Sequence, residues 1–196
     1  MDPKLARLAP GLLIASPPLG DPNFDRAVIL LASHTEEGAL GFVVNRVAPV
    51  GLGALFGLAG YADMNDQDTT PVYLAGPVQR DSGWVVSREP FSPEEEGSLE
   101  LDGRLWISSS KHALDSLAAD VKSGRYRADR CVVTLGYSGW GPGQLEREIG
   151  AGAWLPAPFD PAILFEGSVE SRWERAHALL GIMPVGGISM RMVGQA

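Results

Sequence analysis

The chain has 196 residues, of which 45% are hydrophobic and 20% are charged, so its length and composition are those of one folded domain and exclude a disordered protein. Its formal net charge is −8, and such a chain repels the phosphate backbone of nucleic acids unless its few cations are gathered on one face. Tight, direct binding to nucleic acid is therefore disfavoured, and no specific binding to duplex DNA is expected.

The number of cysteines and the distribution of apolar residues indicate in which cellular compartment the protein is expected. Cys131 is the only cysteine, so an internal disulfide is excluded, which is consistent with a reducing compartment. The N-terminal stretch carries two cations ahead of an apolar run, but prolines at positions 10, 17 and 18 interrupt it as a secretory signal. The uncharged stretch 47–62 contains four glycines and is shorter than the ~20 residues of a membrane helix. We therefore expect a soluble, cytoplasmic protein without a membrane partner.

Three short apolar runs near the N-terminus are typical of buried strands, and they cover 11–16, 27–33 and 39–45. The segment HTEEG between the second and third runs has the length and composition of a hairpin connection. These two strands are therefore predicted to be antiparallel neighbours. The next segment, 51–60, is compatible with a short helix, although its glycines each cost about 1 kcal/mol relative to alanine.

The middle of the chain contains two firm local signals. After an acidic segment at 61–70 that predicts a loop, strands are expected at 72–76 and 83–87. An Asp-Gly pair at 102–103 stands between two alternating runs, which is the strongest short-range signal of a β-hairpin. The segment 108–124 offers a serine N-cap, apolar residues at helical spacing and a glycine as its stop, so it is the best predicted helix.

The C-terminal part is predicted to hold two more elements. The apolar segment AILF at 162–165 is interpreted as a short strand. The segment 169–181 is interpreted as an amphipathic helix with Trp173, Ala176 and Leu180 facing inward.

Together these elements indicate an α+β fold in one domain. The strands are grouped in hairpins, the helices are few, and no regular strand-helix alternation suggests a doubly wound parallel sheet. We expect an N-terminal arm at 1–8, a single domain at 9–182 and a loose C-terminal tail at 183–196.

The stretch VTLGYSGWGPGQLEREI, 133–149, runs from an apolar segment through four glycines into a helical pattern. A P-loop is excluded because no lysine follows these glycines, and a nucleophile elbow because Trp140 stands where a glycine is required. A dinucleotide fingerprint would need a glycine at Glu146. The stretch is therefore interpreted as a strand-to-helix corner with Pro142 in the first helical turn. The free N–H groups of that turn would still favour the binding of an anion.

The three histidines, at positions 34, 112 and 177, lie far apart and show no metal-binding spacing, so no metal or cofactor is predicted. Each is interpreted first as a surface or packing residue. His34 is nevertheless a candidate functional residue, because it begins a turn directly after a buried strand and loop residues carry function more often than core residues.

One basic segment, KSGRYRADR, interrupts this acidic chain. Most such runs are solvated faces, but an adjacent aromatic ring also makes the segment a candidate for contact with RNA or a phosphate-bearing ligand. Its members are Lys122, Arg125, Tyr126, Arg127 and Arg130.

Three stretches resemble the bacterial YqgE/AlgH family, in this order: GLLIASPPLGDPNFDRAVILLASHTEEGALGFVVNR, YLAGPVQRDSGWVV and GYSGWGPGQLEREIGAGAWLPAPFDPAILF. The resemblance covers about residues 9–182. It implies an α+β fold whose bent, mostly antiparallel sheet forms a pseudo-barrel with a few flanking helices, and a role as a transcriptional regulator linked to alginate production. It brings no established catalytic residues. Because this sequence shows no helix-turn-helix, regulation is expected to be indirect.

The resemblance also marks a candidate site for a ligand or a partner. Most of its residues match the family's motifs, and the tyrosine of the glycine-rich stretch is added to them. The site consists of Asp21, Phe24, His34, Asn45, Gly76, Pro77, Tyr137, Trp140 and Gln144.

Two classes of function remain open. The first is a cytoplasmic regulatory or binding protein that acts through a protein or a small molecule. The second is a small-substrate hydrolase that uses His34 and Asn45 with a helix N-terminus as an anion hole. The first is favoured because no complete catalytic constellation is present. His34 and Asn45 are expected within one pocket's width of residues 139–144, and ATP or GTP is not expected to stabilise the fold.

Overall fold

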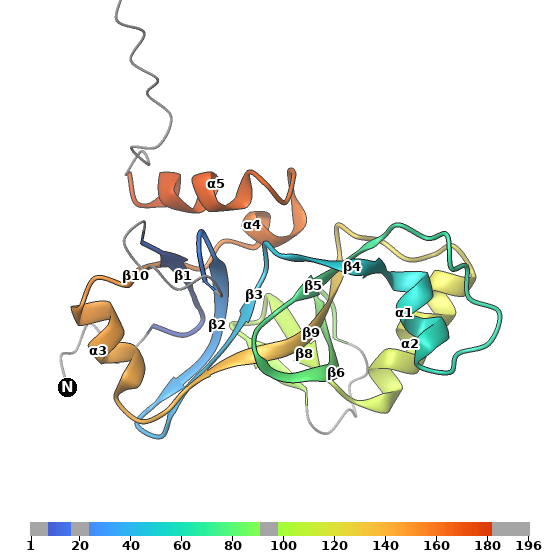
Figure 1. The fold of residues 1–196 in the computed structure, drawn as a ribbon, viewed down its shortest axis with the longest axis horizontal. Coiled ribbons are helices and arrows are strands. Elements are labelled where there is room, and N and C mark those ends of the chain that lie inside the picture. Colours follow the sequence, from blue (N-terminus) through green and yellow to red (C-terminus); the bar gives the residue numbers. More distant parts are fainter. Residues whose placement is uncertain (1–7, 17–23, 91–97, 182–196) are drawn as a thin grey trace, which may run out of the picture.

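The computed structural model describes residues 8–16, 24–90 and 98–181. They form one α+β domain, in which a curled, mostly antiparallel sheet makes a half-barrel flanked by five helices (Figure 1). The predicted fold class is thereby confirmed. The predicted tail at 183–196 and residues 1–7 of the predicted arm lie outside the described residues.

One half of the sheet is built from the N-terminal strands. β1 (Gly11–Ala15), β2 (Val28–Thr35) and β3 (Gly38–Val43) lie side by side in chain order, and β10 (Trp154–Pro158) pairs with β1, all antiparallel. The three predicted strands and the hairpin are confirmed. β10 was not predicted, and its two prolines are tolerated because it is an edge strand.

The other half contains β4 (Val47–Gly51), β5 (Pro71–Leu74), β6 (Val78–Ser87), β7 (Leu99–Leu101) and β8 (Leu105–Ser108). β7 and β8 form the hairpin that the Asp-Gly pair predicts. Both residues of its turn have positive φ, 55° and 63°, as a type I′ turn requires. The other two predicted strands are confirmed as β5 and the end of β6, which pairs with β8.

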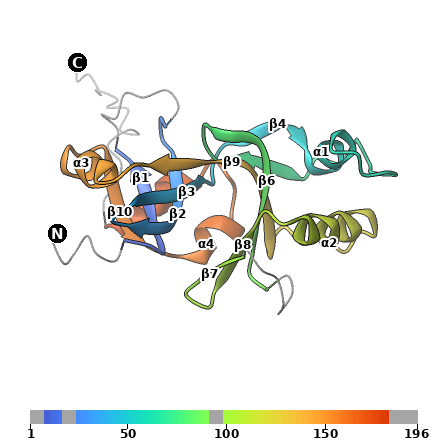
Figure 2. The ribbon, with the colours of Figure 1, turned by 90° about the horizontal axis from the view of Figure 1, so that it is seen from below.

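β9 (Cys131–Trp140) joins the two halves (Figure 2). Its first part lies between β5, to which it is parallel, and β6, whereas its last residues pair with β3. The strand therefore runs through Gly136 and Gly139, and the corner is confined to residues 141–143. Pro142 precedes the following helix instead of entering its first turn, because the next residue, a glycine with φ of 67°, is the N-cap.

Five helices flank the sheet in the described part of the chain. They are α1 (Leu52–Leu58), α2 (Lys111–Lys122), α3 (Gln144–Gly150), α4 (Pro161–Phe165) and α5 (Arg172–Leu179). α1 and α2 lie at one end of the molecule and α3 at the other, while α5 lies over β1 and β10 (Figure 1) and α4 contacts α5 and β9. The four predicted helices correspond to α1, α2, α3 and α5, and of these α1, α2 and α5 have shorter bounds than expected.

Capping residues explain one confirmed helix and one wrong prediction. α2 begins after Ser110, whose hydroxyl accepts a hydrogen bond from the amide three residues later at 3.0 Å, as its predicted N-cap role requires. The segment 162–165 is not a strand but part of α4. Asp160 accepts a hydrogen bond from the amide of Ala162 at 2.9 Å, and Pro161 occupies the first turn. These two signals start a helix despite the apolar, strand-like composition.

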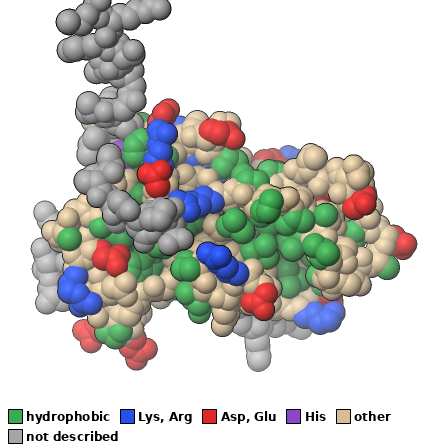
Figure 3. All heavy atoms as spheres, viewed as in Figure 1, with side chains coloured by type: hydrophobic (Ala, Val, Ile, Leu, Met, Phe, Trp, Pro, Cys, Tyr) green, Lys and Arg blue, Asp and Glu red, His purple; other side chains and the backbone are tan. Residues whose placement is uncertain are grey.

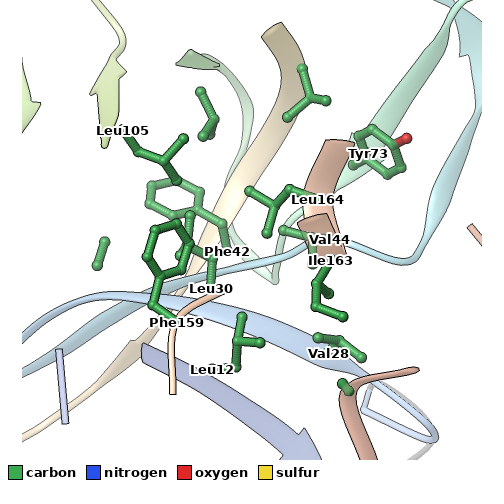
Figure 4. Packing of buried hydrophobic residues seen from close by; sticks show 14 of the residues in the cluster. Leu12, Val28, Leu30, Phe42, Val44, Tyr73, Leu105, Phe159, Ile163 and Leu164 are labelled. Carbon is green, nitrogen blue, oxygen red and sulfur yellow. The ribbon is translucent and has the colours of Figure 1, made fainter. Parts of the chain in front are cut away.

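The largest core lies between the sheet and the C-terminal helices (Figure 4). Side chains from several strands and from α4 converge there: Leu12, Val28, Leu30, Phe42, Val44, Tyr73, Leu105, Phe159, Ile163 and Leu164. α5 is held over this core by polar contacts as well as packing. The buried guanidinium of Arg172 donates to the carbonyls of Val44 and Leu164. The indole of Trp173 donates to the carbonyl of Ala15 at 3.1 Å, so the inward orientation predicted for this tryptophan is confirmed.

Candidate functional site

The structure distributes the predicted site residues over separate places. One group surrounds α3: Phe24, His34, Trp140 and Gln144. A second group lies where β9 passes the turn between β5 and β6: Gly76, Pro77 and Tyr137. Asn45 stands apart from the first group, at the end of β3. Asp21 lies outside the described residues.

Glu148, on α3, holds together the α3 corner, which is the turn at residues 141–143 with the end of β9 and α3 on either side of it. Its carboxylate accepts hydrogen bonds from the indole N–H groups of Trp140 and Trp154, both at 2.8 Å, and from Nε2 of the Gln144 side chain at 2.9 Å. The two indole rings meet edge to face with centroids 6.0 Å apart, and Phe24 contacts Trp154 in the same way at 5.4 Å. Hydrogen bonds to a charged acceptor are roughly twice as strong as neutral ones. The carboxylate therefore fixes α3 to β9 and β10.

His34 faces this corner from β2. Its Nε2 lies 3.1 Å from Oε1 of Glu146 on α3, and only 3% of the His34 side chain and 19% of the Glu146 side chain are exposed. Ala39, which pairs with His34 in the hairpin, also pairs with Trp140. The structure thus brings the hairpin and the corner together as expected, but the imidazole is enclosed and engaged with a carboxylate.

The N-terminus of α3 is occupied by a side chain of its own first turn. Oε1 of Gln144 accepts a hydrogen bond from the amide of Gly141 at 3.1 Å, while the other end of this side chain binds Glu148. Gly41 completes the packing, because a Cβ there would lie 2.6 Å from the side chain of Ile29. The corner is therefore a structural clamp, in which Gln144 already occupies the amide of Gly141.

Asn45 has a structural role at the opposite end of the β2–β3 hairpin. Its Oδ1 accepts from the amide of Val28 and its Nδ2 donates to the carbonyl of Arg26, both at 2.8 Å. Arg26 has a positive φ of 52°, so the Asn45 side chain supports a strained turn. His34 lies six residues beyond Val28 in β2, about 20 Å away at ~3.3 Å per residue. The expected juxtaposition of His34 and Asn45 is therefore wrong.

Glycines allow two backbones to approach closely where β9 passes the β5–β6 turn. A Cβ on Gly76 would lie 2.2 Å from the carbonyl oxygen of Tyr137, and one on Gly136 would lie 2.7 Å from that of Val78. The buried hydroxyl of Ser138 donates to the carbonyl of the residue before Gly76 at 3.1 Å. These motif positions are thus explained by packing, and they fix the shape of the adjoining surface.

A hollow of about 130 Å³ opens beside this crossing, and we call it the Arg46–Arg80 hollow. It is lined by Val43, Arg46, Leu74, Gly76, Pro77 and Arg80. Arg46 donates to the carbonyl of Asp25 at 3.1 Å, whereas the structure, within the described ranges, gives exposed Arg80 no ion-pair partner. Neither arginine was predicted as a site residue, although one directly follows Asn45 and the other lies three residues after Pro77.

The predicted basic segment is neutralised by carboxylates. Its four cations form ion pairs at 2.6–3.0 Å: Lys122 with Asp63, Arg125 with Asp120, Arg127 with Asp129, and Arg130 with Glu89. The Tyr126 hydroxyl donates to the carbonyl of Cys131 at 2.7 Å, and burial raises its pKa. The ring is partly buried against a hydrophobic cluster, and is thus not displayed on the surface as a stacking platform for RNA bases would be.

The same segment borders a larger cavity, of about 360 Å³, which we call the α2 cavity. α2 forms one wall, and the end of β6 and the start of β9 form the other. Its lining residues are Ser87, Glu89, Pro90, Ala113, Ser116, Leu117, Asp120, Arg125, Tyr126, Arg127, Arg130 and Cys131. Four of the five residues of the predicted basic segment thus meet at one concave surface.

The described residues offer little for nucleophilic or metal chemistry. Burial raises the pKa of the Cys131 thiol to about 12, which keeps it protonated at neutral pH. Within the described ranges, no group of three or more His, Cys, Asp or Glu residues is placed to hold a metal ion. None of the helices in this part of the chain combines the length and the apolar character that crossing a bilayer requires.

Known proteins with similar sequences and similar structures support the fold described above. The model of the AlgH-like family matches residues 12–185. A UPF0301 protein of Anaeromyxobacter dehalogenans is 41% identical over 186 residues, which cover 92% of each chain. The solution structure of the AlgH protein from Pseudomonas aeruginosa aligns with a TM-score of 0.74 at 36% identity and covers 96% of each chain.

A more distant crystal structure shows how widely the fold extends. A protein from Corynebacterium diphtheriae aligns with a TM-score of 0.61 at 21% identity, covering 85% of this chain and 83% of that one. At this identity the likeness concerns the fold alone. The family model and the Anaeromyxobacter relative, by contrast, extend over most of this sequence at substantial identity. The chain therefore belongs to the AlgH-like family.

Proposed function

We propose that this protein is a cytoplasmic binding protein of a regulatory type, whose protein partner places an acidic segment in the Arg46–Arg80 hollow. One observation carries the proposal: the six residues that line the hollow include two arginines and no carboxylate, on a chain with a net charge of −8. A local positive site of this kind attracts acidic groups and discriminates against basic ones. The single cysteine is consistent with a reducing compartment.

The size of the hollow favours a side chain over a free small molecule. A volume of about 130 Å³ is below the ~300–1,000 Å³ of typical small-molecule sites. It suits one Asp or Glu side chain together with part of an apolar neighbour. The planar guanidinium group of Arg80 is well matched to a carboxylate, because it offers paired N–H donors, and Arg46 adds a second positive charge beside it.

Apolar side chains beside the hollow offer the partner a second kind of contact, in addition to the arginines. Val47 is 49% exposed and Leu74 is 39% exposed. Hydrophobic side chains gather on this face, over the region of β4 and β5 (Figure 3). Contiguous apolar surface of this kind marks interaction sites on soluble proteins. The partner segment is therefore expected to combine an acidic residue with apolar ones.

The walls of the hollow are rigid, which favours binding. The amide of Leu74 donates to the carbonyl of Arg46 at 2.8 Å. On the other side, the backbone around Gly76 packs tightly against β9 through Gly136. A surface that is ordered before binding loses less entropy when the partner arrives. The motif glycines therefore support the proposal by shaping the hollow, without contacting the partner through side chains.

The hydrolase alternative receives less support. His34 and Asn45 lie at opposite ends of the β2–β3 hairpin, and the first turn of α3 is closed by Gln144. Binding to a protein also accommodates the indirect regulation that the sequence suggests, since it requires no contact with DNA.

A matched pair of peptides tests the proposal. The probe is an amidated peptide of alternating leucine and aspartate, and its control carries asparagine at each aspartate. The acidic peptide is expected to shift the amide NMR signals of residues around the hollow in a saturable manner. Arg80→Gln should weaken this binding about tenfold, the equivalent of one charge-assisted hydrogen bond of ~1.4 kcal/mol.

Arg147→Gln is the control variant, because Arg147 is an exposed arginine on α3, away from the hollow. It should leave the affinity unchanged. Equal affinity for the asparagine peptide, or an acidic peptide that binds Arg80→Gln as well as the unmodified protein, would contradict the proposal.

A further inference from the structure

The α2 cavity has an apolar floor within a polar rim. Ala113 and Leu117 of α2 and Cys131 of β9 supply apolar surface, together with the ring of Tyr126. At about 360 Å³, the cavity lies within the ~300–1,000 Å³ range of small-molecule sites. α2 extends beside the β6 and β8 end of the sheet (Figure 2), and the cavity is lined by residues of α2, of the end of β6 and of the start of β9.

Three arginines on one short loop line the rim of this cavity. Arg125, Arg127 and Arg130 all line it, and 67%, 62% and 53% of their side chains are exposed. The loop backbone is fixed at both ends. The amide of Arg125 donates to the carbonyl of Asp120 at 2.8 Å, and the amides of Arg130 and Cys131 both donate to the carbonyl of Arg127 at 3.0 Å. The guanidinium groups are therefore presented by an ordered turn.

We propose that the α2 cavity binds a small phosphate monoester, with its phosphate among Arg125, Arg127 and Arg130 and its organic group on the apolar floor. Arginine guanidinium groups bind phosphate oxygens through paired N–H donors. Apolar surface next to a few charged groups is the usual composition of a small-ligand site. This site is separate from the Arg46–Arg80 hollow and does not depend on it.

The ion pairs of the rim are compatible with an incoming phosphate. Glu89 holds Arg130, Asp120 holds Arg125 and Asp129 holds Arg127, through pairs that are about half exposed to solvent. Exposed ion pairs contribute little stability, because water screens them and long side chains lose freedom. A dianion can therefore replace a monovalent carboxylate on these arginines without disturbing the backbone.

The same geometry argues for one phosphate group and against RNA. The Tyr126 ring forms part of the floor of the cavity, and its hydroxyl donates to the carbonyl of Cys131, so the ring does not stand on an open surface along which RNA could run. Carboxylates at Asp120 and Glu89 interrupt the positive rim and would repel a continuous phosphate backbone. A single phosphate with an apolar substituent fits between these groups.

Calorimetric and NMR titrations with three probes test the proposal. Phenyl phosphate carries both features of the proposed ligand, inorganic phosphate carries only the anion, and phenol carries only the ring. Phenyl phosphate should bind at least tenfold more tightly than either of the others and should shift the amide signals of the α2 cavity. The double variant Arg127→Gln/Arg130→Gln should weaken its binding at least tenfold, whereas Arg147→Gln should not change it.

A variant that improves binding separates recognition from structural damage. Glu89→Gln removes the carboxylate that competes for Arg130. It should raise the affinity for phenyl phosphate about threefold, a change within the range of an exposed ion pair. Unfolding of the double arginine variant would not explain such a gain.

Four results would overturn the inference. The first is that phenyl phosphate leaves the signals of the cavity unshifted, and the second is that phenol binds as tightly as phenyl phosphate. The third is weaker binding of phenyl phosphate by Glu89→Gln. Inorganic phosphate that binds as tightly as the monoester would also contradict it, because the apolar floor would then have no role.

Discussion

Trp140 is the residue on which the α3 corner depends most directly. It ends β9, it is 7% exposed, and its indole donates to Glu148 on the helix that follows. The ring therefore connects a strand to a helix through packing and a charge-assisted hydrogen bond at the same time. Removing the ring affects both contributions, whereas removing the N–H group affects one.

Trp140→Ala should lower the free energy of unfolding by ~3–5 kcal/mol, the usual cost of deleting a buried large aromatic side chain. Trp140→Phe keeps most of the packing but leaves Glu148 without one of its donors, so it should cost about 1.5–3 kcal/mol. Denaturation with urea, followed by circular dichroism, measures both. A loss below about 1 kcal/mol for the alanine variant would show that the indole does not anchor the corner.

The sequence predicted the importance of some of these residues but not their partners. A tryptophan among glycines indicates a packed corner, and a histidine after a buried strand indicates a turn facing another element. The acceptor Glu148 and the partner Glu146 were not assigned to them, because these contacts depend on how α3 folds back against β2 and β9. Asn45 was grouped with His34 only because both belong to one motif.

At the scale of elements, β9 is the strand that unites the two halves of the sheet. It pairs with β5 and β6 along its first part and with β3 at its end. To pass from one half to the other, the strand must bend next to the β5–β6 turn. Gly136 has a φ of 69° and a carbonyl 2.7 Å from where its Cβ would stand. The bend therefore requires glycine.

Gly136→Ala should destabilise the protein by about 2–4 kcal/mol, because the left-handed conformation costs ~1–2 kcal/mol for alanine and the steric conflict adds to it. Gly57→Ala is the matched control. Gly57 lies inside α1, is exposed, and would have no heavy atom within 4 Å of an added Cβ. That change should stabilise the protein by about 0.5–1 kcal/mol.

Thermal and urea denaturation of the two variants would show opposite signs if the bend is responsible. Destabilisation by both alanines, or by neither, would contradict this explanation. The comparison also separates the effect of backbone conformation from the general effect of glycine on the unfolded chain.

Elements with local signals were the ones that the sequence predicted well. The Asp-Gly hairpin and the serine-capped α2 depend on residues close together in the chain. β10 was missed because a strand with two prolines is recognisable only from its edge position beside β1. The segment 162–165 was assigned to a strand because its apolar composition suits both structures, while the cap that decides between them lies just before it.

At the scale of the whole molecule, charge is distributed unevenly. The net charge is −8, yet arginines meet at two concave places, the Arg46–Arg80 hollow and the α2 cavity. The hollow has no carboxylate among its lining residues, whereas the cavity contains two. The composition predicted the overall charge, but not these concentrations, because they join segments that are distant in sequence. Recognition of small acidic groups is therefore compatible with an acidic protein.

Binding to duplex DNA is expected to be weak and without sequence preference. Proteins that bind DNA tightly neutralise about 6–10 phosphates along a groove, whereas the four cations of the basic segment are already paired with carboxylates. Fluorescence anisotropy at physiological salt, with a duplex from the protein's own genome and a scrambled duplex, should give the same dissociation constant for both, at ~10⁻⁵ M or weaker, and binding should fall as salt is raised. Nanomolar affinity for one duplex would show that a positive, groove-sized surface exists, which the charge distribution of the described residues argues against.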